Sequence, residues 1–229
     1  MEITPDHLVL WRWGFVHLNA TIVYTWAVML LLLTAAWLAT RNIRLDGPRG
    51  RWQTALEAII LGIRAQIREI TDQQEGGEEY LPFVGTLFLF IAVSNTLDVV
   101  PGWRAPTGSL STTTALAGCV AVSVPFFGIR KSGLRGYLRH YCTPTVFMAP
   151  FHLMSEFSRS IALAVRLFGN IMSGSMVVAL LLAIAPLFIP VLMQALGLLI
   201  GLIQAYIFAI LAMVYIAAAI RSQEHAQSA

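Results

Sequence analysis

The chain has 229 residues, of which 57% are hydrophobic and 12% are charged, and its mean hydropathy is +0.72. A soluble globular domain averages about 25% charged residues, so this composition excludes an ordinary soluble domain and predicts a polytopic membrane protein. The net charge is only +3, and the basic residues flank apolar segments, which argues against a nucleic-acid partner. Two cysteines and five scattered histidines form no metal-ligand spacing, so we expect neither a metal nor a cofactor.

The first membrane span is predicted over residues 20–40, after an N-terminal tail over residues 1–19. Thr21 to Thr40 is a run without a charge that is long enough to cross a bilayer. The tail lacks the basic start and short apolar core of a cleavable signal peptide. Four arginines follow the span within a few residues, and by the positive-inside rule they place the N-terminus outside and this cluster in the cytoplasm.

Residues 52–70 have the periodicity of an amphipathic helix. Apolar residues recur at i, i+4 and i+7 from Trp52 to Ile70, whereas charged residues such as Glu57 and Arg64 lie elsewhere on the helical wheel. No soluble domain surrounds this segment, so we expect it to lie along the cytoplasmic surface of the membrane.

A membrane hairpin is predicted over residues 81–129. Its first arm, over residues 81–100, contains the polar residues Asn95 and Asp98 near its end, and its second arm covers residues 111–129. Pro-Gly and a short loop join the two arms. Basic residues that follow the second arm return the chain to the cytoplasm, in agreement with the orientation of the first span.

Two long apolar helices are predicted over residues 146–222, with Pro186 and Pro190 at the turn between them. The second contains 34 residues without a charge, from Leu187 to Ile220. A helix of that length measures about 50 Å, against about 30 Å of hydrocarbon, so it must tilt strongly, bend or run partly across the membrane plane.

These segments together predict one all-α membrane domain that covers the whole chain. It has about five membrane helices and one surface helix, and the last two helices are long and strongly tilted. The arginine that follows the last helix places the C-terminus in the cytoplasm.

Arg166 is the only charged residue between Ile161 and Pro190. A guanidinium within the membrane costs about 2.5–3.5 kcal/mol on insertion scales, and arginine cannot lose its proton to avoid that cost. No acidic residue lies one helical turn from it, so its counter-charge must come from elsewhere in this chain or from another protein. An arginine this deep is a candidate functional residue.

Polar residues share the helical face of Arg166. Asn170 and Ser173 follow it at i+4 and i+7, and Arg159 precedes it by seven residues. Glu156 lies one turn before Arg159 and is its expected ion-pair partner, although Arg159 lies close enough to the cytoplasmic start of the span to snorkel to the interface instead.

The last helix has a narrow seam that contains Gly197, Gly201 and Gln204. Two glycines four residues apart permit close approach of helix backbones. We expect this seam to pack on the Arg166 helix, with polar groups between the two helices.

Several motifs together resemble subunit a of F-type ATP synthases. The run Arg166-Leu-Phe-Gly-Asn170, with Glu156-Phe-Ser-Arg159 before it, resembles the signature of that family. Three further segments are similar to its last-helix motif and to the two ends of its outer hairpin loop: residues 204–216, 95–102 and 106–113. The resemblance covers residues 20–222 in order. A short chain of this kind also resembles the divergent N-type branch of these ATPases.

The resemblance implies a stator subunit in a bacterial inner membrane, beside a rotating ring of c subunits and surrounded by lipid. Subunit b of the peripheral stalk and the catalytic head would be its other partners, and the chemistry on ATP would belong to the head. Two aqueous half-channels would pass protons to and from the ring carboxylates, with Arg166 as the essential charge. Polar positions near the arginine or the channels align with Asn95, Asp98, Asn170 and Gln204.

Some positions depart from the family's pattern. Ser175 and Gly197 stand where some members carry an acidic residue and a histidine, and Ser109 and Ser111 stand where many carry Asp and Asn. Ser173 and Ser175 are therefore further ion-translocation candidates. Hydroxyl and amide oxygens suit a hard cation, so Na⁺ is an alternative to H⁺ as the coupling ion.

Two alternatives come from other functional classes. A secondary transporter could use Arg166 to bind an anion, but no inverted repeat or broken helix is evident. A purely structural scaffold would not need Asn170 and Gln204 on facing seams.

Overall fold

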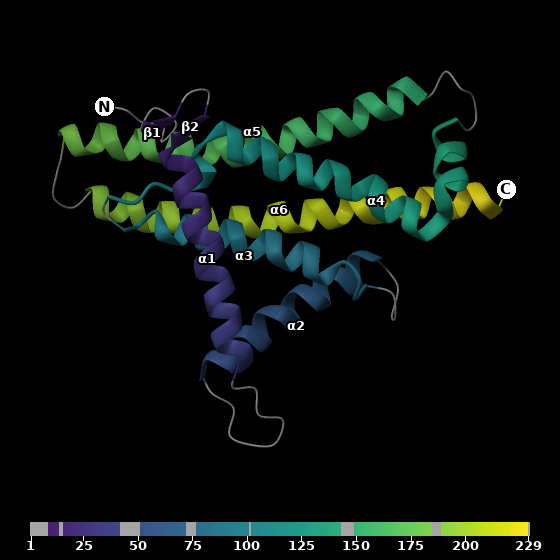
Figure 1. The fold of residues 1–229 in the computed structure, drawn as a ribbon, viewed down its shortest axis with the longest axis horizontal. Coiled ribbons are helices and arrows are strands. Elements are labelled where there is room, and N and C mark those ends of the chain that lie inside the picture. The colour runs from purple at the N-terminus through teal and green to yellow at the C-terminus, as the bar shows by residue number, and fades with distance from the viewer. Residues whose placement is uncertain are drawn as a thin grey trace.

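A computed structural model describes residues 9–13, 16–41, 51–71, 77–100, 102–142, 149–184 and 189–228. The elements in chain order are β1 (Val9–Trp13), β2 (Val16–Asn19), α1 (Ala20–Arg41), α2 (Arg51–Thr71), α3 (Leu81–Leu97), the 3-10 turn η2 (Pro106–Gly108), α4 (Leu110–Cys142), α5 (Ala149–Ile184) and α6 (Ile189–Ser228). Helices α3, α4, α5 and α6 lie alongside one another, and α1 crosses them (Figure 1).

The predicted all-α membrane fold is confirmed. Among the described residues, four helices are long and apolar enough to cross a membrane, namely α1, α4, α5 and α6, and α3 is a shorter apolar helix. The one departure is a short antiparallel hairpin of β1 and β2, which falls within the segment that was predicted as a tail.

Helix α1 has the length and the surface of a simple membrane span. Its 22 residues measure about 33 Å, close to the thickness of the hydrocarbon layer. Large apolar side chains such as Trp26, Leu30 and Leu33 are exposed, as expected where lipid is the solvent.

Helices α5 and α6 are much longer than a bilayer is thick. They contain 36 and 40 residues, which correspond to about 54 and 60 Å. Both run across the direction of α1 (Figure 1). If α1 follows the membrane normal, as its length favours, α5 and α6 are steeply inclined to that normal.

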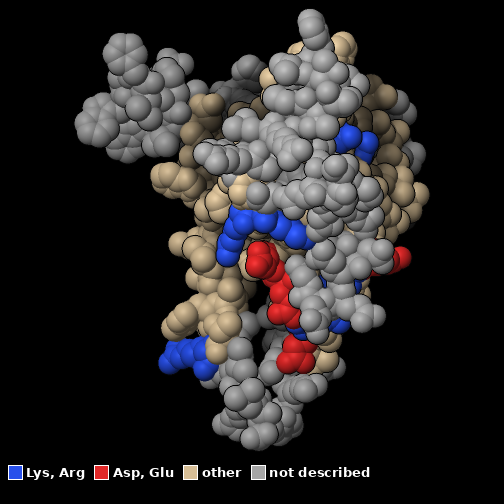
Figure 2. Space-filling model, turned by 90° about the vertical axis from the view of Figure 1, so that its right-hand side faces the viewer, with Lys and Arg blue, Asp and Glu red and all other residues tan. Residues whose placement is uncertain are grey.

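Helix α2 is amphipathic, as its periodicity predicted. Ile67 is buried with Val84 of α3 and Met213 of α6, whereas Arg68 and Glu69 are exposed. Arg64 forms an ion pair with Glu78, just before α3. Figure 2 shows basic and acidic side chains side by side on the face at this end of the molecule.

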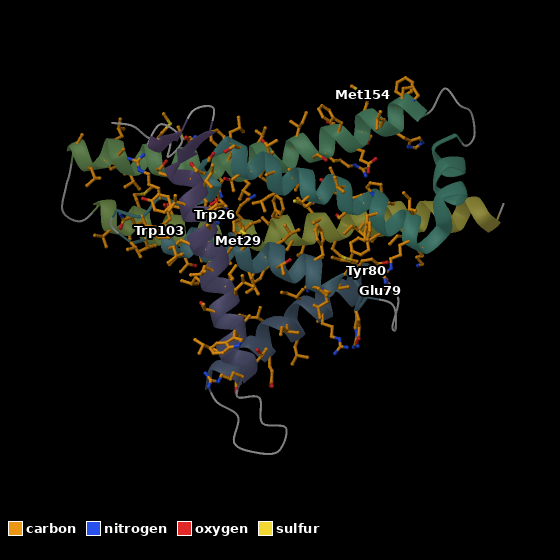
Figure 3. The ribbon with its side chains drawn as sticks, viewed as in Figure 1. Trp26, Met29, Glu79, Tyr80, Trp103 and Met154 are labelled. Atoms are coloured by element: carbon orange, nitrogen blue, oxygen red, sulfur yellow. The ribbon has the colours of Figure 1, made fainter. Side chains whose placement is uncertain are left out.

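The α3–α4 hairpin carries its polar loop at the other end. Tyr80, just before α3, and Trp103, in the loop after it, lie at opposite ends of that helix (Figure 3). The Trp103 ring packs against Tyr24 of α1 at 4.7 Å between centroids. Helix α4 turns sharply at Gly133, whose φ of +73° suits a residue without a Cβ, whereas Pro125 lies within its regular part.

Four helices share one apolar cluster, which we call the central cluster. Its buried residues come from α3, α4, α5 and α6. They are Leu87, Ile91, Ala92, Ala117, Val120, Leu163, Ala164, Leu167, Ala205, Phe208 and Ala212. This cluster holds the middle of α5 and α6 against the hairpin and so sets the position of their polar residues.

Candidate functional site

A cavity of about 670 Å³ lies between α5, α6, the end of α3 and the loop after α3. We call it the α5–α6 cavity. Seven of the residues singled out from the sequence line it: Asn95, Asp98, Asn170, Ser173, Ser175, Gly197 and Gly201. Arg166, Gln204, Glu156 and Arg159 are not among its lining residues. The fold therefore brings together polar groups that are more than a hundred residues apart in the chain.

Asn95 is the most constrained polar residue of this site. Its Nδ2 donates to the backbone carbonyl of Gly201 at 2.8 Å, and its Oδ1 accepts from the hydroxyl of Thr107 at 2.8 Å. Asn95 and Thr107 are both buried. One side chain thus joins α3, η2 and α6.

Gly201 is required by this contact. A Cβ at position 201 would lie 2.9 Å from the Cβ of Asn95, whereas a Cβ at Gly197 would meet no atom within 4 Å. The close approach on the α6 seam is therefore made at Gly201 and with α3. The sequence predicted it with α5, because spacing along one helix does not reveal which neighbour that helix meets.

Asp98 holds the loop that joins α3 to η2 in place through one hydrogen bond. Its carboxylate accepts a hydrogen bond from the backbone N–H of Ala105 at 2.9 Å, which closes the loop between them. Arg104 also lines the cavity, and its Nη1 is buried without a hydrogen-bond partner among the described residues. The cavity thus contains one carboxylate and one guanidinium close together in the chain.

Two serines present hydroxyl oxygens on the α5 wall. Ser173 donates to the carbonyl of Asn170 at 3.1 Å, and Ser175 donates to that of Met172 at 2.9 Å. Because their protons point back to the helix, the remaining lone pairs of both oxygens are available to a water molecule or a cation.

Arg166 lies one turn before Asn170 on α5, outside the cavity. Its side chain is exposed, and it makes no hydrogen bond or ion pair with the described part of the chain. This agrees with the absence of an acidic residue one turn away in the sequence. A counter-charge for Arg166 has to come from beyond the described residues.

Gln204 lies one turn after Gly201 on α6 and is only 5% exposed. Its Nε2 is buried and has no hydrogen-bond partner within the described residues. A buried amide without a partner is costly, so this NH2 group is poised to donate to a water molecule or another polar acceptor at the α6 seam.

Arg159 and Glu156 lie further toward the start of α5. The Arg159 guanidinium lies over the Tyr215 ring of α6, 5.5 Å from its centroid. No ion pair between Arg159 and Glu156 is formed among the described side chains. Tyr215 is half-buried against the central cluster, and its ring face offers the cation an alternative partner.

Sequence reasoning missed the role of Thr107. Thr107 falls inside the hairpin motif, and it is followed by other hydroxyl residues, so nothing in its spacing marks it. Its complete burial and its bond to Asn95 are visible only in the folded chain. Gln194, which lies on the same α6 seam one turn before Gly197, also lines the cavity, as does Trp103, for which the sequence gives no local signal.

Comparisons with known proteins show the family of this chain. The family model described as ATP synthase A chain matches residues 22–217. The chain belongs to this family of F-type ATP synthase subunits a. This family member thus spans a membrane and serves ATP synthesis coupled to ion transport, and the predicted identity is confirmed.

Individual relatives cover the chain almost end to end. It is 57% identical over 225 residues to "ATP synthase subunit a 2" of Acaryochloris marina, which covers 98% of this chain and 95% of that protein. It is 55% identical over 228 residues to "ATP synthase subunit a 1" of Chlorobaculum parvum, an alignment that covers 100% of both proteins. It is 53% identical over 224 residues to "ATP synthase subunit a" of Albidiferax ferrireducens, an alignment that covers 98% of this chain and 96% of that protein. These bacterial relatives and the apolar helices fit a bacterial inner membrane.

Proposed function

We propose that this chain is the stator subunit that carries ions past a ring of c subunits in a rotary ATP synthase, with Arg166 as the essential charge. The observation that carries the proposal is an exposed Arg166 that has no partner in the described chain, one turn from the α5–α6 cavity. A membrane cation in that state needs a partner that comes to it, and a carboxylate on a neighbouring ring meets this need.

The α5–α6 cavity is the proposed half-channel on the outside. The positive-inside pattern places the N-terminus outside, the C-terminus in the cytoplasm and the loop after α3 outside. That loop supplies Asp98 and Arg104 to the cavity wall. From there Ser173, Ser175 and Asn170 form a polar wall on α5 that leads toward Arg166. The second half-channel would open from the cytoplasmic side of Arg166.

The electrostatics of the exchange follow from desolvation. A ring carboxylic acid that faces lipid stays protonated, because burial penalises the charged form. Beside the Arg166 guanidinium its ionised form is favoured, so the proton leaves into one half-channel. The next carboxylate loads from the other half-channel. Because arginine keeps its charge throughout, Arg166 also opposes direct leakage of cations between the two half-channels.

The remaining partners follow from this role. Subunit b of the peripheral stalk would hold the chain still against the ring, the catalytic head would make or hydrolyse ATP, and lipid would cover the exposed apolar face of α1. This chain would form and break no covalent bond. Glu156 and Arg159 would stabilise the start of α5 beside Tyr215.

Na⁺ is the second candidate for the coupling ion. The polar lining of the cavity consists mainly of hydroxyl and amide groups, with Asp98 as its one acidic residue, and oxygen ligands of this kind suit a hard cation. The discriminating measurement is whether Na⁺ protects the assembled complex from reagents that modify carboxyl groups. Protection at constant pH favours Na⁺, and its absence favours H⁺.

The test of the main proposal is ATP-driven ion pumping by assembled complexes in vesicles. Arg166→Ala should abolish coupled pumping, and Arg166→Lys should reduce it at least tenfold because a lysine in the low-dielectric membrane can lose its proton. Arg68→Ala, which removes an exposed arginine on α2, is the matched control and should pump normally. Undiminished pumping by Arg166→Ala complexes that contain the c-ring would contradict the proposal.

A further inference from the structure

The hydrogen bonds of Asn95 lie at the end of the α5–α6 cavity that is closest to Gln204. Thr107 donates to Asn95, and Asn95 donates to the Gly201 carbonyl, with both distances at 2.8 Å. We call these three residues the Asn95 clamp. It joins η2, α3 and α6, so it ties the hairpin loop to the last helix within the membrane domain.

The clamp marks the limit of the cavity on two of its walls. On α3 the lining residue is Asn95, and Asp98 and Val99 follow it just past the end of the helix. On α6 the lining residues lie between Met193 and Gly201. One turn beyond the clamp lie Ile91 on α3 and Ala205 on α6, each with 0% of its surface exposed. Both belong to the central cluster, so closely packed residues follow directly behind the clamp, with the buried amide of Gln204 beside them.

The wall of the cavity on α5 differs from the walls on α3 and α6. On α5 the lining ends at Asn170, but one turn further Arg166 is exposed rather than buried. A cation or water chain that reaches the inner end of the cavity therefore meets packed residues between α3 and α6, where Gln204 is buried, and finds an exposed polar side chain ahead of it along α5. We propose that the Asn95 clamp closes the cavity between α3 and α6 and so directs ions along α5 to Arg166. This inference rests on the proposed function.

The chemistry of the clamp explains why closure depends on all three members. Glycine at position 201 lets the amide reach a backbone carbonyl, since a Cβ there would meet Asn95 at 2.9 Å. Removing the Thr107 hydroxyl leaves the buried Oδ1 of Asn95 without its donor, and an unsatisfied buried group costs more than the bond contributes. Water entering between α3 and α6 would relieve that cost by bonding to Asn95, and the same water would extend the cavity past the Asn95 clamp.

Thiol labelling of the assembled complex tests the clamp directly. In a background with Cys119→Ala and Cys142→Ala, Ser173→Cys reports on the cavity and Ile91→Cys reports on the packed region behind the clamp. A membrane-impermeant maleimide is added from the outside. We expect Ser173→Cys to react and Ile91→Cys to be protected. Adding Thr107→Val should raise the labelling rate of Ile91→Cys at least tenfold without changing that of Ser173→Cys.

Matched variants separate closure from general loosening. Thr107→Ser keeps the hydroxyl and should keep Ile91→Cys protected. Thr114→Val makes the same change at an exposed threonine of α4 and should have no effect. Met213→Cys, which is buried in the separate cluster beside α2, should stay unlabelled when Thr107→Val is added. If Thr107→Val complexes do not assemble, Thr107→Ala removes the same hydroxyl without adding bulk.

The outcomes distinguish this inference from the function on which it rests. If Ser173→Cys reacts from the outside but Ile91→Cys stays protected in the Thr107→Val and Thr107→Ala complexes, the clamp does not close the cavity and the proposed half-channel stands. If Met213→Cys becomes labelled together with Ile91→Cys, the effect is general loosening and the inference is overturned. If Ser173→Cys does not react from the outside, both the half-channel and its closure by the clamp are overturned.

Discussion

The side chain of Asn95 occupies the space that any side chain at position 201 would need. The amide of Asn95 reaches the Gly201 carbonyl at 2.8 Å, and a Cβ at Gly201 would lie 2.9 Å from the Cβ of Asn95. Contacts this short between Cβ atoms require the helices to move apart. The distance between α3 and α6 is thus set by one glycine and one asparagine.

Gly201→Ala should therefore destabilise the membrane domain. Inserting a methyl group into a packed contact costs about 1–3 kcal/mol. The measurement is the thermal stability of the assembled complex in detergent. Gly118→Ala on α4, where a Cβ would meet nothing within 4 Å, is the control and should be neutral or slightly stabilising. Equal stability of the two variants would show that α3 and α6 separate without cost.

Replacements at Asp98 should separate its hydrogen bond to the Ala105 N–H from its negative charge in the cavity. Asp98→Asn retains an oxygen that can accept from the Ala105 N–H but removes the charge from the cavity, so we expect assembly to be kept and ion-driven ATP synthesis to fall several-fold. Asp98→Leu removes the acceptor as well and should also reduce assembly. Both effects are measured in membrane vesicles, as ATP synthesis per assembled complex and as c-ring content. Full synthesis by Asp98→Asn would show that the charge serves the loop alone.

The contact between Arg159 and Tyr215 should contribute modestly to stability. Cation–π pairs at exposed sites are worth about 0.5–1 kcal/mol, and Arg159 is exposed. Tyr215→Leu should lower the thermal stability of the complex by that amount, whereas Tyr215→Phe keeps the ring and should preserve it. In an Arg159→Gln background the two substitutions should become equivalent, and a persistent difference would assign the effect to packing of the ring.

The ion pair between Arg64 and Glu78 should be weak. Its side chains are 36% and 63% exposed, and an exposed pair of this kind is worth about 0–1 kcal/mol because water and salt screen it. We expect Glu78→Gln to shift the unfolding temperature by a small amount at low salt and not at all at high salt. A large shift that persists at high salt would mean that the pair is shielded from solvent in the assembled complex.

Local features of the sequence determined most of the elements. The helices predicted over residues 20–40 and 52–70 are observed as Ala20–Arg41 and Arg51–Thr71. The bounds of such helices can be predicted because the length and the periodicity of an apolar run are properties of one segment and its solvent. For the same reason the isolation of Arg166 was readable from the chain alone.

The tertiary structure decided which polar groups meet. Asn95 bonds to Gly201 across 106 positions of the chain and to Thr107 across 12, and these pairings depend on how α3 and α6 are rotated and shifted against each other. Helical spacing placed Gly201 on a seam but could not say which helix the seam faces. The physical reason is that a helix defines its own faces, whereas the choice of neighbour is made by the packing of all the helices together.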